Sequence, residues 1–188
     1  MVDAIIGVAL GLGLAAAAGL RIFVPVLGAG LAAHFGVVAL NPAFAWVGTI
    51  PALIAFGTAS ALEIGAYYVP WLDHVLDIVA TPTAVGAGIL ASAAVVTDLP
   101  PLVTWVVAIV GGGGAAGLVQ MLSVAARVKS TLTTGGLANS VVATGETVGA
   151  ASITALAIFV PVIALLFLIL AGVLMLRITG RLRRSRDR

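Results

Sequence analysis

Arg21 fits its surroundings least, because it lies near the middle of a long apolar stretch. A charge at the centre of a bilayer costs about 2.5–3.5 kcal/mol on insertion scales, so we expect this guanidinium to face protein or water and to have a partner. Glu63 in the next apolar stretch is the candidate partner, although it lies roughly 10 Å from the centre of its own helix at a rise of about 1.5 Å per residue. Backbone carbonyls freed by a kink at Pro25 are the alternative partners.

A second polar group has the side chains of a cation site or a proton relay: Glu63, Asp73, His74 and Asp77. Asp73 and Asp77 are four residues apart and share a helix face, and His74 is three residues before Asp77. Carboxylate oxygens bind hard cations, and histidine titrates near neutral pH. The alternative is a solvated interfacial helix that Trp71 anchors at the level of the lipid headgroups.

A third group combines hydroxyls, glycines, an amide and a carboxylate within a hydrophobic chain. It consists of Thr133, Thr134, Gly135, Gly136, Asn139 and Glu146. Such residues suit an unwound segment, in which exposed carbonyls and hydroxyls coordinate an ion or solute. A polar loop at the membrane surface is the alternative, and Glu146 could equally cap a helix. Together with Arg21 and Glu63, these residues form the candidate pathway for an ion or solute.

The chain offers little for catalysis. It has no cysteine, and its two histidines are far apart in sequence, so we expect neither thiolate chemistry nor a metal site. No serine lies within an obvious acid–histidine arrangement. The glycine run 111–114 lies inside an apolar stretch and lacks the lysine–threonine pair of a phosphate loop. We therefore expect neither an enzyme nor a bound cofactor.

The composition indicates an integral membrane protein. Of the 188 residues, 62% are hydrophobic and 9% are charged, and the mean hydropathy is +1.25. An ordinary soluble domain is roughly 45–50% apolar and about 25% charged. A small soluble fold cannot hide this much apolar surface, because much of its area stays exposed. The composition thus excludes a soluble enzyme, a nucleic-acid-binding domain and a disordered chain.

The basic residues are concentrated at the C-terminus. Six of the nine lysines and arginines lie within residues 177–188. Arginines next to a membrane span remain cytoplasmic and are attracted to anionic lipid headgroups. We therefore expect a basic cytoplasmic tail that contacts the bilayer and no nucleic-acid partner.

We expect an all-α, polytopic transmembrane helix bundle that forms one domain, residues 1–176. A bilayer core needs about 20 apolar residues per helix. Five stretches can supply such helices: 4–33, 44–68, 78–96, 102–126 and 150–176. If Arg127 and Lys129 are cytoplasmic like the tail, the chain crosses a sixth time as a broken polar segment near 130–149, which neighbouring protein must shield. Five crossings result if this segment only dips into the membrane and returns.

Two internal similarities favour an inverted repeat. Residues 17–20 recur at 115–118, and six of the nine residues of 79–87 recur at 142–150. They divide the chain into half-repeats of about 4–97 and 102–176. Three crossings in each half give the halves opposite orientations, which is the plan of many transporters.

Small residues spaced four apart line several of the expected helices. They are Gly7 and Gly11; Gly57, Ala61 and Gly65; and Gly113 and Gly117. This spacing lets two helix backbones approach closely in lipid. We expect such faces to pack the bundle or to join copies in a homo-oligomer, and a pathway lined by backbone is the alternative.

Two stretches carry a resemblance to a known family. One comprises Gly19-Leu20-Arg21, Pro25, Glu63, Pro70, Asp73 and Asp77, and the other comprises residues 130–139 with Glu146. Together they resemble a family of small bacterial integral-membrane proteins that is catalogued as a domain of unknown function, over roughly residues 18–165. The chain departs from that pattern at Ser140, at Thr147 and at Tyr67-Tyr68. The resemblance supports a membrane protein, for which we expect a bacterial cytoplasmic membrane, and it implies no activity.

The leading functional hypothesis is a transporter or channel-like permeation pathway for an ion or small solute. The pathway would lie where residues 130–149 meet Arg21 and Glu63, and Glu63 or Glu146 would be the coupling acid. The alternative is a non-transporting membrane protein, with a structural, lipid-interacting or partner-binding role, in which the small residues serve only packing.

Overall fold

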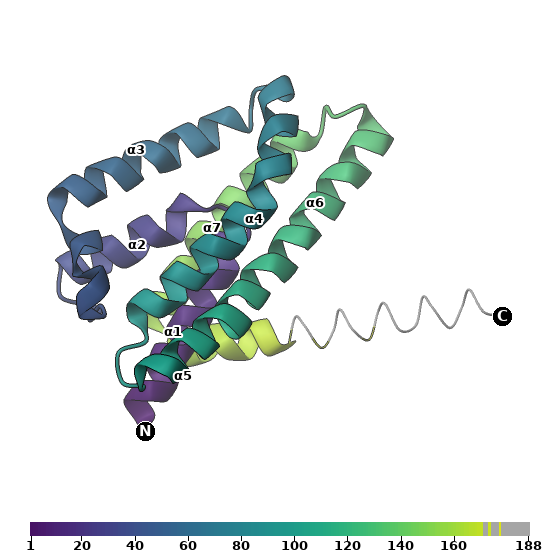
Figure 1. Cartoon of the computed structure of the whole chain (residues 1–188). Helices are drawn as coiled ribbons and strands as arrows, with labels where there is room; N and C mark the ends of the chain where they lie inside the picture. Colours follow the sequence, from purple (N-terminus) through teal and green to yellow (C-terminus); the bar gives the residue numbers. More distant parts are fainter. Residues whose placement is uncertain (171–172, 174–176, 178–188) are drawn as a thin grey trace.

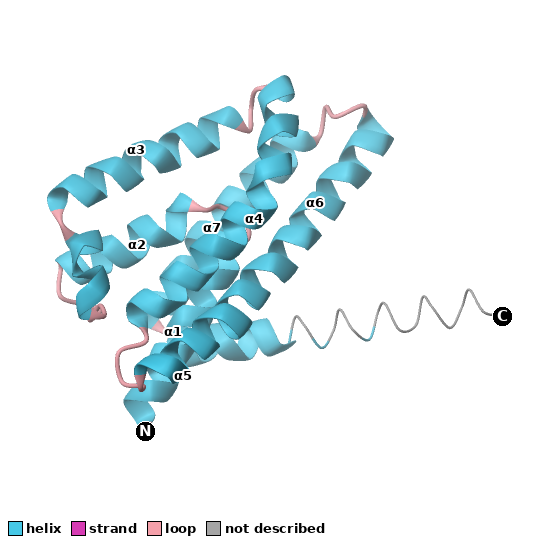
Figure 2. Cartoon of the chain, in the orientation of Figure 1, coloured by secondary structure: helices cyan, strands magenta, loops and turns pink. Residues whose placement is uncertain are grey.

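The computed structural model describes residues 1–170, 173 and 177, without the side chains of residues 70–78. This part of the chain is helical and contains no strand, which confirms the all-α expectation (Figure 2). The elements are α1 (Val2–Ala18), α2 (Phe23–His34), the 3₁₀-helix η1 (Pro42–Gly48), α3 (Ile50–Ala66), α4 (Pro70–Val95), α5 (Pro101–Val106), the π-helix η2 (Val107–Gly113), α6 (Gly114–Thr134) and α7 (Asn139–Phe159). A further apolar helix, Pro161–Leu170, follows α7.

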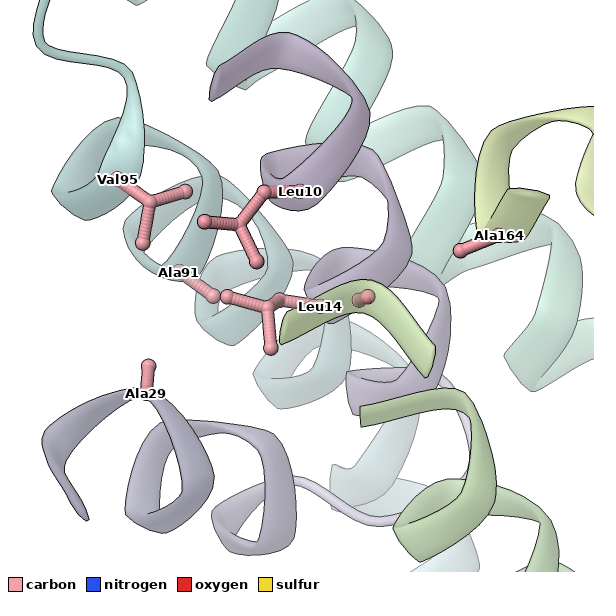
Figure 3. Close-up of a cluster of buried hydrophobic side chains, with 7 residues drawn as sticks. Leu10, Leu14, Ala29, Ala91, Val95 and Ala164 are labelled. Carbon is pink, nitrogen blue, oxygen red and sulfur yellow. The ribbon is translucent and has the colours of Figure 1, made fainter. Parts of the chain in front are cut away.

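Helix α1 packs against both α4 and α7, and α6 packs against α4 (Figure 1). Helices α2 and α3 lie side by side at a steep angle to these four helices. The buried apolar core joins Leu10 and Leu14 of α1 to Ala29 of α2 and to Ala91 and Val95 of α4 (Figure 3). The core side chains are short, so the helices approach one another closely.

Glycines produce several of these close approaches. A Cβ atom built at Gly88 of α4 would lie 2.9 Å from the carbonyl oxygen of Gly112, and one built at Gly11 of α1 would lie 2.8 Å from Oγ of Ser92. A side chain at either position would push the helices apart, which explains why small residues are placed there. The small-residue face of α3 makes no such close approach at Gly57, because a Cβ atom built there would meet nothing within 4 Å.

Two helical stretches of the described residues are long and apolar enough to cross a membrane: Pro101–Thr134 and Asn139–Phe159. A third span results if η1 and α3, which are bent by 68° relative to each other, count as one broken span. The remaining apolar helices are shorter. These helices support membrane insertion, as the composition predicts.

Two expected helices differ in their bounds. The stretch 4–33 is divided into α1 and α2 by a break at residues 19–22. The helix expected to begin near residue 78 begins at Pro70 instead, because proline suits the first turn of a helix, where its missing amide hydrogen is not needed.

The segment near 130–149, expected to be broken and unwound, is helical on both sides of a short break. Helix α6 continues to Thr134 and α7 begins at Asn139, so the break is a short turn between two long helices. Gly135 and Gly136 have φ angles of +64° and +90°, which glycine adopts readily. The hydroxyl of Thr134 accepts a hydrogen bond from the amide of Ala138 at 3.1 Å. Residues 130–139, named here the hairpin turn, therefore satisfy much of their own hydrogen bonding.

Candidate functional site

The break between α1 and α2 places Arg21 inside the bundle. The amide of Arg21 still donates to the carbonyl of Ala17, which tightens the end of α1. Gly19 lies against α6, where a Cβ atom would be 2.5 Å from the carbonyl oxygen of Ala116. The chain then turns into α2, and the guanidinium of Arg21 points into the protein with only 1% of the residue exposed.

Glu146 of α7 is the ion-pair partner of Arg21, at 3.2 Å between Nη1 and Oε2. The same carboxylate accepts from Arg127 of α6, through Nε at 3.0 Å and through Nη2. The hydroxyl of Ser123, one turn before Arg127, also donates to Glu146. One buried carboxylate thus holds two arginines from different elements, since Arg127 and Glu146 are only 3% and 6% exposed.

Arg21 makes further hydrogen bonds to α7. Its Nε donates to Oγ1 of Thr147 at 3.0 Å, and its Nη2 donates to the carbonyl oxygen of Ala143 at 2.8 Å. Glu146 and Thr147 follow Ala143 by three and four positions, so all three residues lie on one side of α7. The guanidinium therefore binds this face through several directed contacts, which fix its orientation.

Tyr67 adds an aromatic surface to the two arginines. It caps the C-terminal end of α3 and is buried. The Cζ atoms of Arg21 and Arg127 lie 4.2 Å and 4.1 Å from the centre of its ring. Such cation–π contacts are worth more when they are desolvated, as here. Tyr67 therefore connects α3 to both arginines.

Glu63 lies one turn before Tyr67 on α3 and binds the start of α2. Its Oε1 accepts from the amide of Ile22 at 2.7 Å and its Oε2 accepts from the amide of Phe23 at 3.1 Å. The free amides at a helix N-terminus and the helix dipole both favour a carboxylate at this place. The expected Arg21–Glu63 pair is therefore wrong as an ion pair. Glu63 instead binds the backbone directly after Arg21.

These five residues, Arg21, Glu63, Tyr67, Arg127 and Glu146, are named here the charge cluster. Two guanidinium groups and two carboxylates balance in formal charge, and all of them are at most 9% exposed. Removing charges from water carries a large penalty, which is recovered only with good geometry and with the remaining hydrogen bonds satisfied. The partners come from the α1–α2 break and from α3, α6 and α7, so the charge cluster fixes how these elements meet.

The residues of the hairpin turn lie apart from the charge cluster. Asn139 is seven residues before Glu146 on α7, which corresponds to roughly 10 Å along the helix. Thr133 and Thr134 are exposed, and their hydroxyls donate to carbonyls one turn earlier in α6. Asn139 donates from Nδ2 to Oγ1 of Thr131 at 3.2 Å. The expected pathway set is therefore divided between the charge cluster and the hairpin turn, in which Thr133 and Thr134 are exposed and Asn139 is buried.

The side chains of Asp73, His74 and Asp77 lie outside the described residues. Among the described side chains, no group of three or more histidine, aspartate or glutamate residues is arranged to hold a metal ion. The carboxylates and guanidinium groups of the charge cluster can form ion pairs, exchange a proton at a carboxylate or bind a charged group.

Sequence reasoning did not assign Arg127, Tyr67 and Ser123 to the site. Arg127 was expected at the cytoplasmic surface beside Lys129, but the structure buries it. Two signals could have located it. The polar residues Gln120, Ser123, Arg127 and Ser130 recur at helical spacing and all face inward. Arg127 and Glu146 are also equidistant from the peptide bond between Gly136 and Leu137, as expected for facing positions in an antiparallel helical hairpin.

Comparison with known proteins places the chain in a family. It matches the family model described as Domain of unknown function (DUF4126) over residues 8–181, a range that contains the whole charge cluster and the hairpin turn. The resemblance seen in the sequence is thereby confirmed. No curated protein and no solved structure matches the chain. The chain belongs to the DUF4126 family of domains of unknown function.

Proposed function

We propose that this membrane protein moves an ion or small solute across the bilayer and that the charge cluster is the polar centre of its path. One observation carries the proposal. The apolar stretch that contains Arg21 is a discontinuous helix, α1 and α2, and the carboxylate of Glu63 sits on the first amides of its second half. Discontinuous helices with charged groups at their inner ends are the usual binding sites of secondary transporters.

Burial of the charges adds support. Ionisable side chains within membrane helices are costly, and they usually mark ion or substrate pathways and proton relays. A chain that needed only to pack its helices would do so with small residues, as α1 and α4 already do at Gly11 and Gly88. The four buried charges therefore favour a role beyond packing.

In the proposed mechanism, Glu63 and Glu146 are the coupling acids. Protonation of Glu63 removes the negative charge that holds the start of α2, and the four-residue break at 19–22 lets α2 pivot relative to α1. Protonation of Glu146 removes the charge that Arg21 and Arg127 share, which leaves both guanidinium groups able to bind an anionic group or water. Each carboxylate thus links a proton to a movement or to a binding event.

The inverted repeat with five to six crossings, the cytoplasmic C-terminus and the bacterial cytoplasmic membrane belong to this proposal. One contact supports the repeat, because the two copies of the Ala-Ala-Gly-Leu sequence meet where Gly19 lies against Ala116. The two copies of the second similarity lie on α4 and α7, and α1 packs against both helices. Broken spans such as α1–α2 would each count as one crossing.

Proton or cation flux in proteoliposomes tests the proposal. Purified protein is reconstituted in vesicles that contain a pH-sensitive dye, and a proton or potassium gradient is imposed. We expect flux with the wild-type protein and loss of flux with Glu63→Gln. Asp98→Asn is the matched control, because it removes an exposed carboxylate outside the charge cluster and should leave flux unchanged. Absence of wild-type flux under every gradient would contradict the proposal.

A further inference from the structure

A second feature of the molecule is an apolar cleft between α2, η1, α3 and α4. Its volume is about 390 Å³. Its walls include Phe23, Trp46, Phe56, Ala87, Ala91 and Ala94. Thr83 is the polar residue among those lining it, and its hydroxyl donates to the carbonyl of Val79. The cleft therefore offers apolar surface and almost no hydrogen-bonding groups.

The cleft exists because α3 packs on α2 and η1 rather than along α4, which follows it in the chain. The face of α4 that lines the cleft carries small residues, among them Gly86, Ala87, Ala91 and Ala94. A Cβ atom built at Gly86 would meet nothing within 4 Å. Larger side chains at these positions would fill the space, so the sequence of α4 keeps it open.

The dimensions of the cleft fit one extended chain. Its lining on α4 extends from Thr83 to Ala94, which corresponds to roughly 16 Å at about 1.5 Å per residue. The length is close to half of the ~30 Å hydrocarbon core, which is the depth of one lipid leaflet.

Water is a poor occupant of this cleft, since a buried water molecule needs two to four polar partners. We propose that the cleft binds one acyl chain of a membrane phospholipid. Trp46 indicates which end of the lipid lies where. It is 55% exposed, packs on Phe56 with 5.8 Å between ring centres, and belongs to a residue type enriched at the level of the headgroups. The headgroup therefore lies near η1, and the chain runs along α4 toward Phe23.

Seated there, the acyl chain contacts Ile22 and Phe23, which line the cleft and whose amides hold Glu63. The lipid would thus contact the start of α2, which Glu63 also holds. The inference rests on the cleft alone, and it stands or falls independently of the proposed transport.

Photolabelling with a phospholipid tests the inference. Wild-type protein is reconstituted in phosphatidylcholine vesicles that contain a phosphatidylcholine with a diazirine in its acyl chain, and labelled residues are mapped by mass spectrometry after illumination. We expect labels at Ala91 and Ala94, which line the cleft and are only 5% exposed. Absence of labels at these alanines in the wild-type protein would overturn the inference.

Two variants sharpen the test. Gly86→Leu narrows the cleft at the end away from η1, and we expect it to reduce labelling of Ala91, which lies five residues from Gly86. Gly57→Leu is the matched control, because Gly57 is also a helical glycine facing open space but does not line the cleft, and it should keep the labels. Equal labelling in both variants would overturn the inference. Labelling by a diazirine fatty acid but not by the phospholipid would overturn the assignment to a phospholipid.

Discussion

The charge cluster and the hairpin turn are both polar regions of a hydrophobic chain, yet they are held in different ways. The threonines of the hairpin turn donate to carbonyls one turn away in the same helix, at 2.9 Å and 2.8 Å. Arg21 donates to α7 and Glu63 accepts from α2, so the partners in the charge cluster come from elements far apart in sequence. Polar groups that are hydrogen-bonded within their own helix mark where that helix ends. Polar groups that are bonded between elements fix how the helices are arranged.

Among the substitutions in these two regions, loss of the Glu146 carboxylate should lower the stability of the protein most. Glu146→Gln removes the one carboxylate that Arg21 and Arg127 share and leaves both guanidinium groups buried without it. We expect a loss of about 3–5 kcal/mol in the free energy of unfolding, the usual cost of breaking a buried ion pair. Unfolding of the purified protein in detergent, followed by circular dichroism, measures this loss.

Addition of Arg127→Met to Glu146→Gln removes one of the two positive charges that the Glu146 carboxylate balanced, and should recover part of the stability. Asp98→Asn, at an exposed carboxylate, is the control and should change little. Stability of Glu146→Gln equal to that of the control would mean that the charge cluster does not hold the helices together.

Sequence reasoning reached the fold class because hydropathy reports directly on helices in lipid. It also located the interruption at Arg21, where the chain does break. It expected an unwound segment at residues 130–149, where the structure has two helices joined by a short turn, because hydroxyls and glycines are common in both kinds of segment. The difference lies in the backbone geometry of Gly135 and Gly136 and in the local bond from Ala138 to Thr134, which composition does not encode.

At the site, the sequence identified Arg21, Glu63 and Glu146 as unusual because each is charged in an apolar setting. It did not identify their partners, since pairing depends on how the break at 19–22 turns the chain. Tyr67 was noted only as a departure from the family pattern, because an aromatic residue near a helix end is ordinary at a membrane interface. Its place beneath two guanidinium groups appears only when the end of α3 meets Arg21 and Arg127.

Substitution of Tyr67 in the charge cluster should lower the stability of the protein by an intermediate amount. Tyr67→Leu keeps an apolar side chain but removes the ring over which both arginines lie, and Tyr67→Phe keeps the ring. Because two desolvated cation–π contacts are involved, we expect the Leu variant to be less stable than the Phe variant by about 1–3 kcal/mol. The same unfolding measurement compares the two variants. Equal stabilities would show that the ring serves as apolar filling only.

The smallest effect should come from Thr133 in the hairpin turn, compared with Ser123 beside the charge cluster. Both residues lose one hydroxyl on substitution by alanine. Ser123→Ala removes a buried hydrogen bond to the carboxylate of Glu146 and should cost about 1.5–3 kcal/mol. Thr133→Ala removes an exposed hydroxyl bonded within its own helix and should change stability by less than about 0.5 kcal/mol, with flux in proteoliposomes unaltered. Loss of flux in Thr133→Ala without loss of stability would show that the hairpin turn belongs to the transport pathway. Thr133 would then be needed for the ion or solute to cross, although it contributes nothing to the stability of the fold.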